Sequence, residues 1–319
     1  MIRFLVLRVL TGILVLWLIS MAVFGLFFVA PNNVARTLGG RQATPQTIEL
    51  INHRLGLDRP IWRQYVSFVN DALHGNLGYD YYHQQPVTTM IREAFPITLS
   101  LALGAALIWV LLGVFNGVLS ATHPRGFWDR SLTVTSLVFY SMPSFVLGLA
   151  ALYLLFFKLT IAGYAWFPGG GYAPLSEGVG PWAQHLVLPW LTIALVAAAT
   201  YTRLTRGSML DVLGEDYIRT AVAKGLTPRR VTYRHALRSA LTPVVTQFGI
   251  DLGQLVGGVV ITEQIFSLPG LGRTAVVAIT QQDLPVIIGI VLVASTAVIV
   301  ANILVDLAYA ALDPRVRLS

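Results

Sequence analysis

The sequence predicts an all-α membrane protein that crosses the bilayer six times. Of its 319 residues, 55% are hydrophobic and only 12% are charged, about half the charged share of an ordinary soluble domain. Its mean hydropathy is +0.68. Six windows poor in charge each exceed the ~20 residues that cross a hydrocarbon core. Together these observations make lipid the solvent for most of the chain.

The six spans are expected in windows that hold no Asp, Glu, Lys or Arg, apart from Asp251 in the fifth; the fourth and sixth predicted spans reach just past their windows, to include Arg203 and Asp306. Their predicted limits are 9–30, 96–121, 132–157, 186–204, 239–262 and 284–306. The first window is longer than the apolar core of a cleaved signal peptide, about 7–15 residues, and is therefore counted as a span. A signal peptide is the alternative, because small residues occur near Ala30.

Basic residues divide unequally between the two sides of these spans. Fourteen Lys and Arg residues fall on the side of both termini, and eight fall on the other side, where eight acids balance them. Cytoplasmic segments carry the excess of Lys and Arg. Both termini are therefore expected in the cytoplasm. The formal charge of +7 is explained by this excess on the cytoplasmic side, so no nucleic acid is expected as a partner.

Residues 31–95 form a polar insertion on the outer side, between the first two spans. Gln42–Gly56 is expected to be helical, with Thr44 as its N-cap and Pro45 in its first turn. Pro60–His74 is expected to form a second short helix, because its apolar residues recur at helical spacing. Two short helices can cover a channel mouth, but they bury too little to form a domain by themselves.

Two proline-containing segments interrupt the later spans. Pro143 lies inside the third span, where we expect a tolerated kink. Ser267–Gly272, with the sequence SLPGLG, is expected to belong to a non-helical outer segment that begins at Glu263, since irregular backbone is tolerated where protein buries it. Asp306, at the inner end of the sixth span, is expected to pair with an Arg on that side.

The connection between the fourth and fifth spans, residues 205–238, is large, basic and helix-forming. Asp216 stands near the start of a predicted helix and Gly225 ends it, since glycine adopts the left-handed conformation past a helix C-terminus. Thr227 suits the N-cap and Pro228 the first position of the next helix. The pattern predicts a helix of about ten residues, a sharp corner and a second helix leading into the fifth span.

The short predicted helix carries one narrow apolar edge. This edge consists of Tyr217, Ile218, Ala221 and Val222. Such a helix can lie on anionic lipid at the membrane surface. The alternative is a peg that docks in a groove of a cytoplasmic protein, with Ala221 small enough for close approach.

The chain contains no motif for ATP hydrolysis. A phosphate-binding P-loop needs Gly-Lys-Ser/Thr, and the two lysines, Lys158 and Lys224, follow Phe157 and Ala223. The hydrolase motifs G-x-S-x-G and H-E-x-x-H do not occur either. There is no cysteine, and the six histidines show no metal-ligand spacing. No catalytic residue, metal site or cofactor is therefore expected in this chain.

The fifth predicted span carries the one acidic residue inside the membrane, Asp251. Gln247 and Gln254 lie about one turn away on either side, so the three can form a polar stripe along a solute pathway. An ionisable residue within a span usually faces a cavity or a partner. A structural hydrogen bond to a neighbouring helix is the alternative, and the nearby glycines, which favour close helix packing, support it.

Several short, distinct motifs lie along the chain. Asp216–Leu226 reads DYIRTAVAKGL and Arg234–Pro243 reads RHALRSALTP. Outer motifs are LDRP at Leu57–Pro60, GNLG at Gly75–Gly78 and EQIFSLPGLG at Glu263–Gly272. These motifs resemble those of ABC importer permeases of the oligopeptide, dipeptide and nickel branch, and the large outer insertion is similar to that of their B subunits. Asn76 replaces an Asp of that pattern, and Arg219 replaces the Glu of the more general permease motif.

The resemblance implies a permease subunit of the bacterial plasma (inner) membrane that forms half of the pathway of an ATP-driven importer of short peptides. Its implied partners are a second similar permease, two subunits that bind ATP and Mg²⁺, and an extracytoplasmic substrate-binding protein. The coupling helix that docks on an ATPase would comprise Asp216, Tyr217, Arg219, Thr220, Ala221, Lys224, Gly225, Leu226, Thr227 and Pro228. The outer gate would comprise Glu263, Phe266, Pro269 and Gly270.

Three alternatives stay open at the level of sequence. The same machine could carry nickel, glutathione or another small solute. A secondary transporter driven by an ion gradient predicts paired intramembrane acids or bases, whereas Asp251 alone lies in the middle of a span. A membrane-embedded enzyme would need a nucleophile and a base, and the sequence offers no recognisable pair.

Overall fold

The computed structural model describes residues 2–26, 44–46, 49, 53, 58–80 and 82–312. Within these ranges the fold is helical apart from one antiparallel pairing of two-residue strands, β1 (Tyr79–Asp80) and β2 (Gln85–Pro86). The predicted all-α class is thus confirmed. The chain divides into two compact units, one of residues 1–95 with 274–303 and one of residues 96–273 with 304–319.

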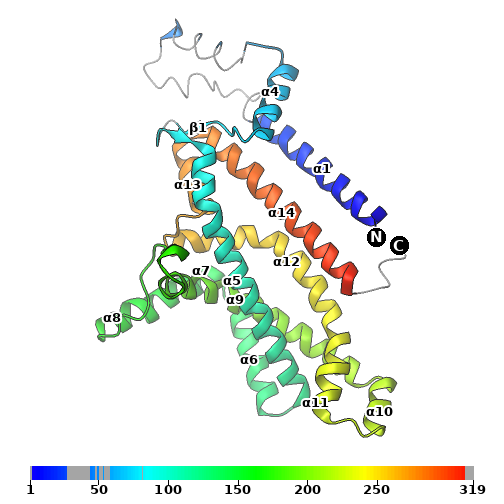
Figure 1. The fold of residues 1–319 in the computed structure, drawn as a ribbon. Coiled ribbons are helices and arrows are strands. Elements are labelled where there is room, and N and C mark those ends of the chain that lie inside the picture. Colours follow the sequence, from blue (N-terminus) through cyan, green and yellow to red (C-terminus); the bar gives the residue numbers. More distant parts are fainter. Residues whose placement is uncertain are drawn as a thin grey trace. The chain divides into compact units, whose positions relative to one another are not determined.

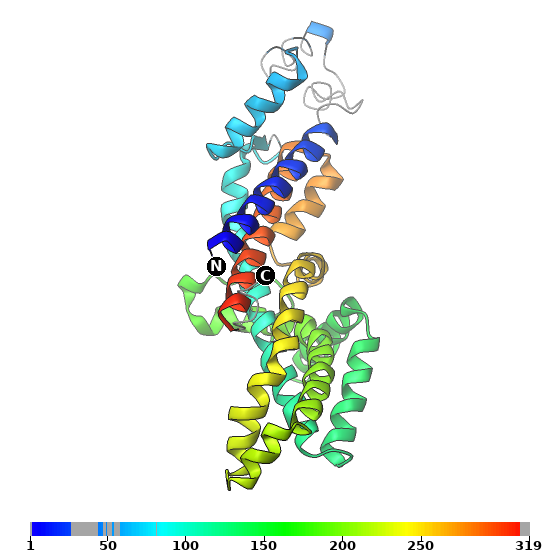
Figure 2. The same cartoon turned by 90° about the vertical axis from the view of Figure 1, so that its right-hand side faces the viewer.

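The first unit is built on α1 (Ile2–Phe24), α4 (Ile61–Leu73), most of α13 (Leu271–Gln281) and the larger part of α14 (Leu284–Leu312). α1 and α14 run side by side (Figures 1 and 2), and a Cβ at Gly12 would lie 2.8 Å from Ile299 Cγ2. α4 confirms the second predicted outer helix. The first, predicted at Gln42–Gly56, lies largely outside the described residues. α13 was not predicted as a separate helix.

The body of the second unit consists of the larger part of α5 (Val87–Thr122), with α6 (Phe127–Ser141), α7 (Ser144–Ala151), α9 (Val179–Leu213) and α12 (Leu237–Ile265). Between α7 and α9 lie a π-helical segment (Leu152–Lys158), the short α8 (Leu159–Ile161) and a 3-10 turn (Leu175–Glu177). A Cβ at Gly113 would lie 2.3 Å from Tyr201 Cβ, and one at Gly117 2.4 Å from Thr205 Cβ. These two glycines, four residues apart on α5, therefore allow α9 to approach closely.

Five helical segments among the described residues are long and apolar enough to cross a membrane. They are Leu5–Phe24, Val87–Thr122, Ser144–Ile161, Val179–Leu213 and Leu284–Leu307. They overlap the predicted spans one to four and six, and the second and fourth extend well beyond the predicted limits. The predicted fifth span lies within α12, a continuous helix of 29 residues.

The third predicted span is not one kinked helix, and the expectation of a simple kink at Pro143 is wrong. α6 ends at Ser141, and both Met142 (φ −90°, ψ 127°) and Pro143 (φ −59°, ψ 138°) are extended before α7 begins. Proline cannot donate the N–H that would continue α6, and its ring disfavours the helical conformation of the residue before it. The segment that meets the length and hydropathy of a span therefore begins only at Ser144.

Two buried carboxyl groups meet in the first unit, near the start of α14. Asp80 is 1% exposed and Asp283 is 5% exposed. Although burial opposes it, hydrogen bonds from the backbone N–H groups of His83 (3.0 Å) and Tyr82 (2.7 Å) and a contact with the His83 ring lower the pKa of Asp80. Burial and the hydrogen bond shared with Asp80 raise the pKa of Asp283 to about 6. Below about pH 6, Asp80 thus holds the charge while Asp283 holds the shared proton.

We expect Asp283→Asn to be more heat-stable than the unmodified chain at neutral pH and equally stable near pH 4. A carboxyl whose pKa is raised by folding contributes stability that is complete below its ordinary value of 3.8 and is lost as the pH rises through about 6. Asparagine has no proton to lose, so its Tm should not show this fall, which we expect to be about 3 °C. Circular-dichroism melts at several pH values measure it.

The matched control is Asp58→Asn, which changes an exposed carboxyl in the same unit. Its Tm should follow that of the unmodified chain at every pH. If Asp283→Asn and Asp58→Asn have the same pH dependence, the two carboxyl groups do not share a proton.

Candidate functional site

The predicted coupling segment folds as its local sequence indicates. α10 comprises Asp216–Ala223, and Gly225 has a φ of +78°. The Gly225 N–H donates to Val222 O (2.9 Å) and the Leu226 N–H donates to Ala221 O (3.3 Å). This pair of bonds is the Schellman arrangement that satisfies the last carbonyls of a helix. The predicted helix end at Gly225 is therefore confirmed, with eight helical residues in place of about ten.

The corner after Gly225 continues into a second helical stretch (Figure 1). Thr227 is extended, and Pro228 is the first residue of α11 (Pro228–Arg230), as the sequence predicts. The Thr227 side chain makes no capping hydrogen bond within the described part of the chain. Val231–Ala236 is π-helical and leads into α12. Short π-helical stretches recur at functional positions, so the conformation of this stretch is a feature that the sequence did not predict.

The four apolar residues of α10 do not form one edge. Ile218 (3% exposed) and Ala221 (7%) face inward, while Tyr217 (45%) and Val222 (58%) face outward. The inward pair belongs to an inner apolar cluster that consists of Val118, Ala121, Met209, Ile218, Ala221, Val231, Ala236 and Ala240. One face of α10 therefore packs against the rest of the chain, and the opposite face is exposed.

The remaining predicted docking residues are distributed over the exposed face of α10 and the corner that follows it. Asp216 and Arg219 are exposed and form a loose pair at 3.4 Å. Thr220 and Lys224 are exposed as well. Leu226, by contrast, packs against the inner apolar cluster. The outward surface of α10 is thus mixed, with charged, polar and apolar side chains next to one another.

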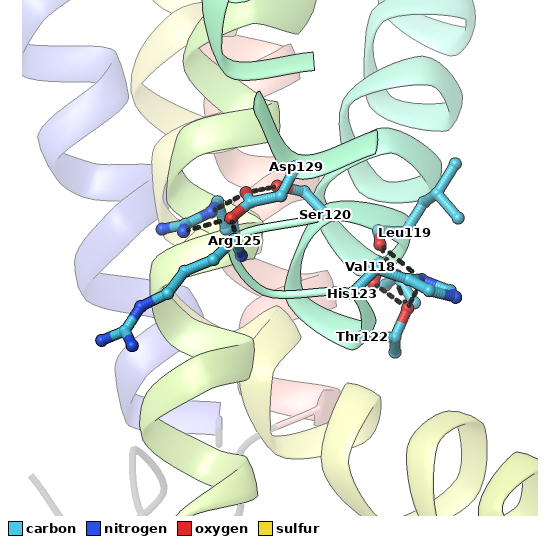
Figure 3. Close-up of polar contacts among 8 residues, drawn as sticks. Val118, Leu119, Ser120, Thr122, His123, Arg125 and Asp129 are labelled. Carbon is cyan, nitrogen blue, oxygen red and sulfur yellow. Dashed lines mark hydrogen bonds and ion pairs between the residues drawn. The ribbon is translucent and has the colours of Figure 1, made fainter. Parts of the chain in front are cut away.

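One buried ionic group beside this segment was not predicted as a site. Asp129, at the start of α6, is 4% exposed. Its carboxylate accepts hydrogen bonds from Arg206 Nε (2.6 Å), Arg206 NH2 (2.9 Å), the Ser120 hydroxyl (2.5 Å) and the Arg125 N–H (2.8 Å), and Figure 3 shows this network. The charged Arg206 side chain in particular lowers the pKa of Asp129 strongly. Sequence spacing could not identify this pair, because Arg206 lies 77 positions from Asp129.

The predicted pathway residues lie on α12. Gln247 Nε2 donates to Asp251 Oδ1 at 2.8 Å, and both side chains are half-buried. Gln254 lies on the same helix, but its side chain is outside the described part of the structure. Asp251 is close enough to Tyr201 of α9 to interact electrostatically with its hydroxyl. Asp251 therefore has partners on two helices.

Two buried polar groups accompany Asp251. The Tyr201 hydroxyl and the Trp109 indole N–H have no hydrogen-bond partner in the described structure. The Trp109 ring lies 6.1 Å from that of Tyr201 and 6.0 Å from that of Phe248. Sequence spacing could not identify this aromatic group, because its members come from α5, α9 and α12.

The predicted outer segment is organised around a buried carboxylate. Glu263 is fully buried; its Oε1 accepts from the Thr98 hydroxyl (2.6 Å) and its Oε2 from the Arg273 N–H (2.9 Å). The Leu271 N–H in turn donates to the Thr98 hydroxyl (2.8 Å). These bonds hold the start of α13 next to Glu263, near the end of α12, and the non-helical stretch connects the two.

The other predicted gate residues surround Glu263 unequally. Phe266 is 1% exposed, whereas Pro269 is exposed. A Cβ at Gly270 would lie 2.2 Å from Glu263 Oε1, so only glycine permits this approach of backbone to carboxylate. The Gly171 N–H donates to Phe266 O (2.9 Å), which brings the glycine-rich loop that follows α8 onto the same site.

Among the described residues, no group of three His, Asp or Glu side chains is placed to hold a metal ion. The acidic side chain of each region instead accepts hydrogen bonds from neighbouring groups of the chain: Asp129 from Arg206, Asp251 from Gln247 and Glu263 from Thr98.

Two family models match the chain. Residues 110–318 match "Binding-protein-dependent transport system inner membrane component", and residues 1–102 match the N-terminal membrane component of the same system.

Curated relatives are similar over nearly their whole length, and three of them illustrate the range. A probable peptide ABC transporter permease of Sinorhizobium fredii is 39% identical, with 97% of both chains covered. A di/tripeptide transport system permease of Pseudomonas aeruginosa is 36% identical, with 94% of both covered. A glutathione transport system permease of Escherichia coli is 36% identical, with 99% of both covered.

The fold is shared with solved structures. One is an inward-facing form of the MetNI methionine ABC transporter, with a TM-score of 0.55 and 19% sequence identity. The alignment covers 70% of this chain and 96% of that chain.

Proposed function

The chain belongs to the binding-protein-dependent transport system inner membrane components, the permease subunits of ABC importers, and we propose that it forms half of the translocation pathway for short peptides. The assignment of peptides as the cargo is supported by the sequence identity of 36–39% with permeases named for peptides, di- and tripeptides and glutathione. Glutathione is itself a modified tripeptide, so it is the second candidate within the same chemical class.

A permease of this family is a non-catalytic subunit of the inner membrane, and ATP is bound by a separate ATPase partner. The proposed assembly adds a second similar permease, two ATP-binding subunits and an extracytoplasmic substrate-binding protein. The absence of a Gly-Lys-Ser/Thr sequence in the chain supports the need for a separate motor.

We propose six spans, with α12 as the fifth and both termini in the cytoplasm. A helix of 29 residues is about 43 Å long at 1.5 Å per residue, more than a hydrocarbon core requires. With six spans, the basic segment around α10 and α11 lies on the same side as both termini, and this is the side with the excess of Arg and Lys.

In the proposed mechanism, the outward face of α10 docks on an ATPase and its inward face transmits the displacement. Tyr217 and Val222 are exposed on the docking face. Ile218 and Ala221 pass the movement to the inner apolar cluster, which joins α10 to α5, α9 and α12. Pro228, with its fixed φ, makes the corner after Gly225 stiff. The π-helical stretch Val231–Ala236 then leads directly into the helix that carries Asp251.

Two further regions complete the proposed pathway. Asp251, with Gln247 beside it, is a candidate contact for the α-ammonium group of a peptide, because a carboxylate within a span is costly unless it faces a partner or a cavity. The segment from Glu263 to Gly270 is the candidate outer gate beneath the substrate-binding protein. Its ties to Thr98 and Arg273 would hold it closed until the helices move.

Reconstitution tests this function. The complete transporter in sealed proteoliposomes, with ATP inside and binding protein outside, is expected to accumulate tritiated trialanine, whereas vesicles without ATP should only equilibrate with it. Glutathione uptake in the same vesicles separates the two cargo candidates. This chain alone should accumulate neither. Accumulation by the isolated chain under a proton or sodium gradient would instead identify a secondary transporter.

A further inference from the structure

The network around Asp129 lies beside the surface that receives α10. We propose that Asp129, Arg206 and Ser120 are positioning residues for energy coupling. They hold the inner ends of α5, α6 and α9 together, so that these ends move as one unit when α10 is displaced. This inference rests on the proposed coupling role of α10.

The geometry of the network favours a fixed arrangement. The two Arg206 nitrogens bind both carboxylate oxygens of Asp129, at 2.6 and 2.9 Å. Such a two-pronged pair restricts both distance and angle. The Ser120 hydroxyl and the Arg125 N–H occupy the remaining acceptor positions. One carboxylate therefore joins α5, the α5–α6 turn and α9 to the start of α6.

Two of the helices that the network joins, α5 and α9, also contribute to the inner apolar cluster that buries α10. Val118 and Ala121 flank Ser120 on α5, and Met209 lies about one turn beyond Arg206 on α9. All three belong to the inner apolar cluster with Ile218 and Ala221 of α10. A displacement of α10 thus reaches α5 and α9 within a few residues of the ion pair.

The network also fixes the inner end of α6. α5 and α9 pack closely through Gly117, whose Cβ would lie 2.4 Å from Thr205 Cβ. α6 packs along α9, where the Arg203 guanidinium lies 4.5 Å from the centre of the Tyr140 ring. Packing of apolar side chains permits small sliding movements, whereas the two-pronged pair of Asp129 and Arg206 fixes the distance and angle between α6 and α9 at this end.

Stability alone is a weak reason for this ion pair. Burying a carboxylate costs solvation that its partner only partly restores, and apolar residues of similar size often stabilise as well or better. Arg206 is also 32% exposed on its side chain, against 6% for Asp129, so water screens part of the attraction. What the pair provides beyond stability is a defined geometry at the junction of three helices.

Coupling in the complete transporter tests the proposal. Asp129→Asn is expected to lower trialanine uptake per ATP hydrolysed by about 10-fold, within the range found for residues that carry coupling between sites, while basal ATP hydrolysis changes less than about twofold. Arg206→Lys keeps the charge but cannot form the two-pronged pair, so an intermediate loss is expected. Asp211→Asn changes an exposed acid on the same α9 and should leave the ratio unchanged.

A distance measurement separates positioning from simple stabilisation. The chain has no cysteine, so spin labels can be placed through Glu215→Cys, just before α10, and Phe127→Cys, at the exposed start of α6. The unmodified background should give one narrow distance distribution with and without ATP and vanadate. Asp129→Asn should broaden it. The proposal would be overturned if Asp129→Asn or Arg206→Lys left both the uptake per ATP hydrolysed and the distribution of spin-label distances unchanged.

Gly225→Pro, assayed in parallel, distinguishes failure of this inference from failure of the proposed function. If Gly225→Pro uncouples and Asp129→Asn does not, only the positioning role falls. If neither variant changes uptake per ATP, α10 is not the coupling element, and the inference falls with that premise.

Discussion

Gly225→Pro is expected to abolish peptide uptake while the assembled transporter continues to hydrolyse ATP. Gly225 has a φ of +78°, and proline is confined to a φ near −65°. Proline also lacks the N–H that donates to Val222 O. The corner between α10 and α11 must therefore change its direction. We expect uptake to fall about 30-fold or more, which corresponds to about 2 kcal/mol of lost coupling.

The matched control is Gly225→Asn, because asparagine tolerates the left-handed conformation and keeps its N–H. Its uptake should stay within about fivefold of the unmodified transporter, since a residue in this conformation costs of order 1 kcal/mol. Uptake of trialanine and release of phosphate are measured in the same proteoliposomes. Normal uptake by Gly225→Pro would show that the corner does not transmit the movement.

Ala221→Arg extends this prediction to the inward face of α10. Ala221 is 7% exposed within the inner apolar cluster, so arginine there must displace α10 from α5 and α9. The expected result is again uncoupling, but through lost packing with the chain itself. Ala223→Arg places the same side chain at an exposed position of α10 and should preserve that packing.

The sequence predicts those features of the coupling segment that local chemistry decides. Gly225 and Pro228 each require a particular backbone conformation, and their positions locate the end of one helix and the start of the next. The burial of Ile218 and Ala221 is a different matter. Both faces of α10 carry apolar residues, and only the packing of Met209 and Val118 against one of them decides which face is buried.

The candidate site shows the same division. The Asp129 pair joins residues 77 positions apart, and no spacing rule connects an acid at the start of one helix with an arginine on another. Glu263 and Gly270 lie within one recognisable motif, whereas Thr98, which completes their network, is 165 positions from Glu263. Motifs therefore locate a site in the chain, and tertiary contacts supply its remaining members.

Hydropathy predicts where the chain can meet lipid but not where its helices break. The third predicted window is continuous in composition, yet Pro143 divides it into α6 and α7. Whether a proline kinks or ends a membrane helix depends on whether neighbouring groups satisfy the freed carbonyls. That information lies in the packing around α6 and α9, which the window itself does not contain.

Gly270→Ala is expected to disrupt the outer segment and to reduce peptide uptake by at least about 10-fold. The added methyl group would lie 2.2 Å from Glu263 Oε1 and 2.3 Å from Glu263 Cδ, too close for either atom to remain in place. Glu263 is fully buried, so moving it breaks its bonds with the Thr98 hydroxyl and the Arg273 N–H. Overpacking of this kind costs about 1–3 kcal/mol, and an unsatisfied buried carboxylate adds to it.

Pro269→Ala is the matched control, because Pro269 precedes Gly270 directly but is exposed. It should transport nearly normally. For Gly270→Ala, uptake, Tm and the stimulation of ATP hydrolysis by loaded binding protein are measured together. A gate that has lost its closed conformation should hydrolyse ATP without binding protein, whereas a merely unstable permease should lose assembled complex and ATP hydrolysis in parallel. Uptake within about twofold of normal, with an unchanged Tm, would mean that the close approach of Gly270 to Glu263 is not required in the working transporter.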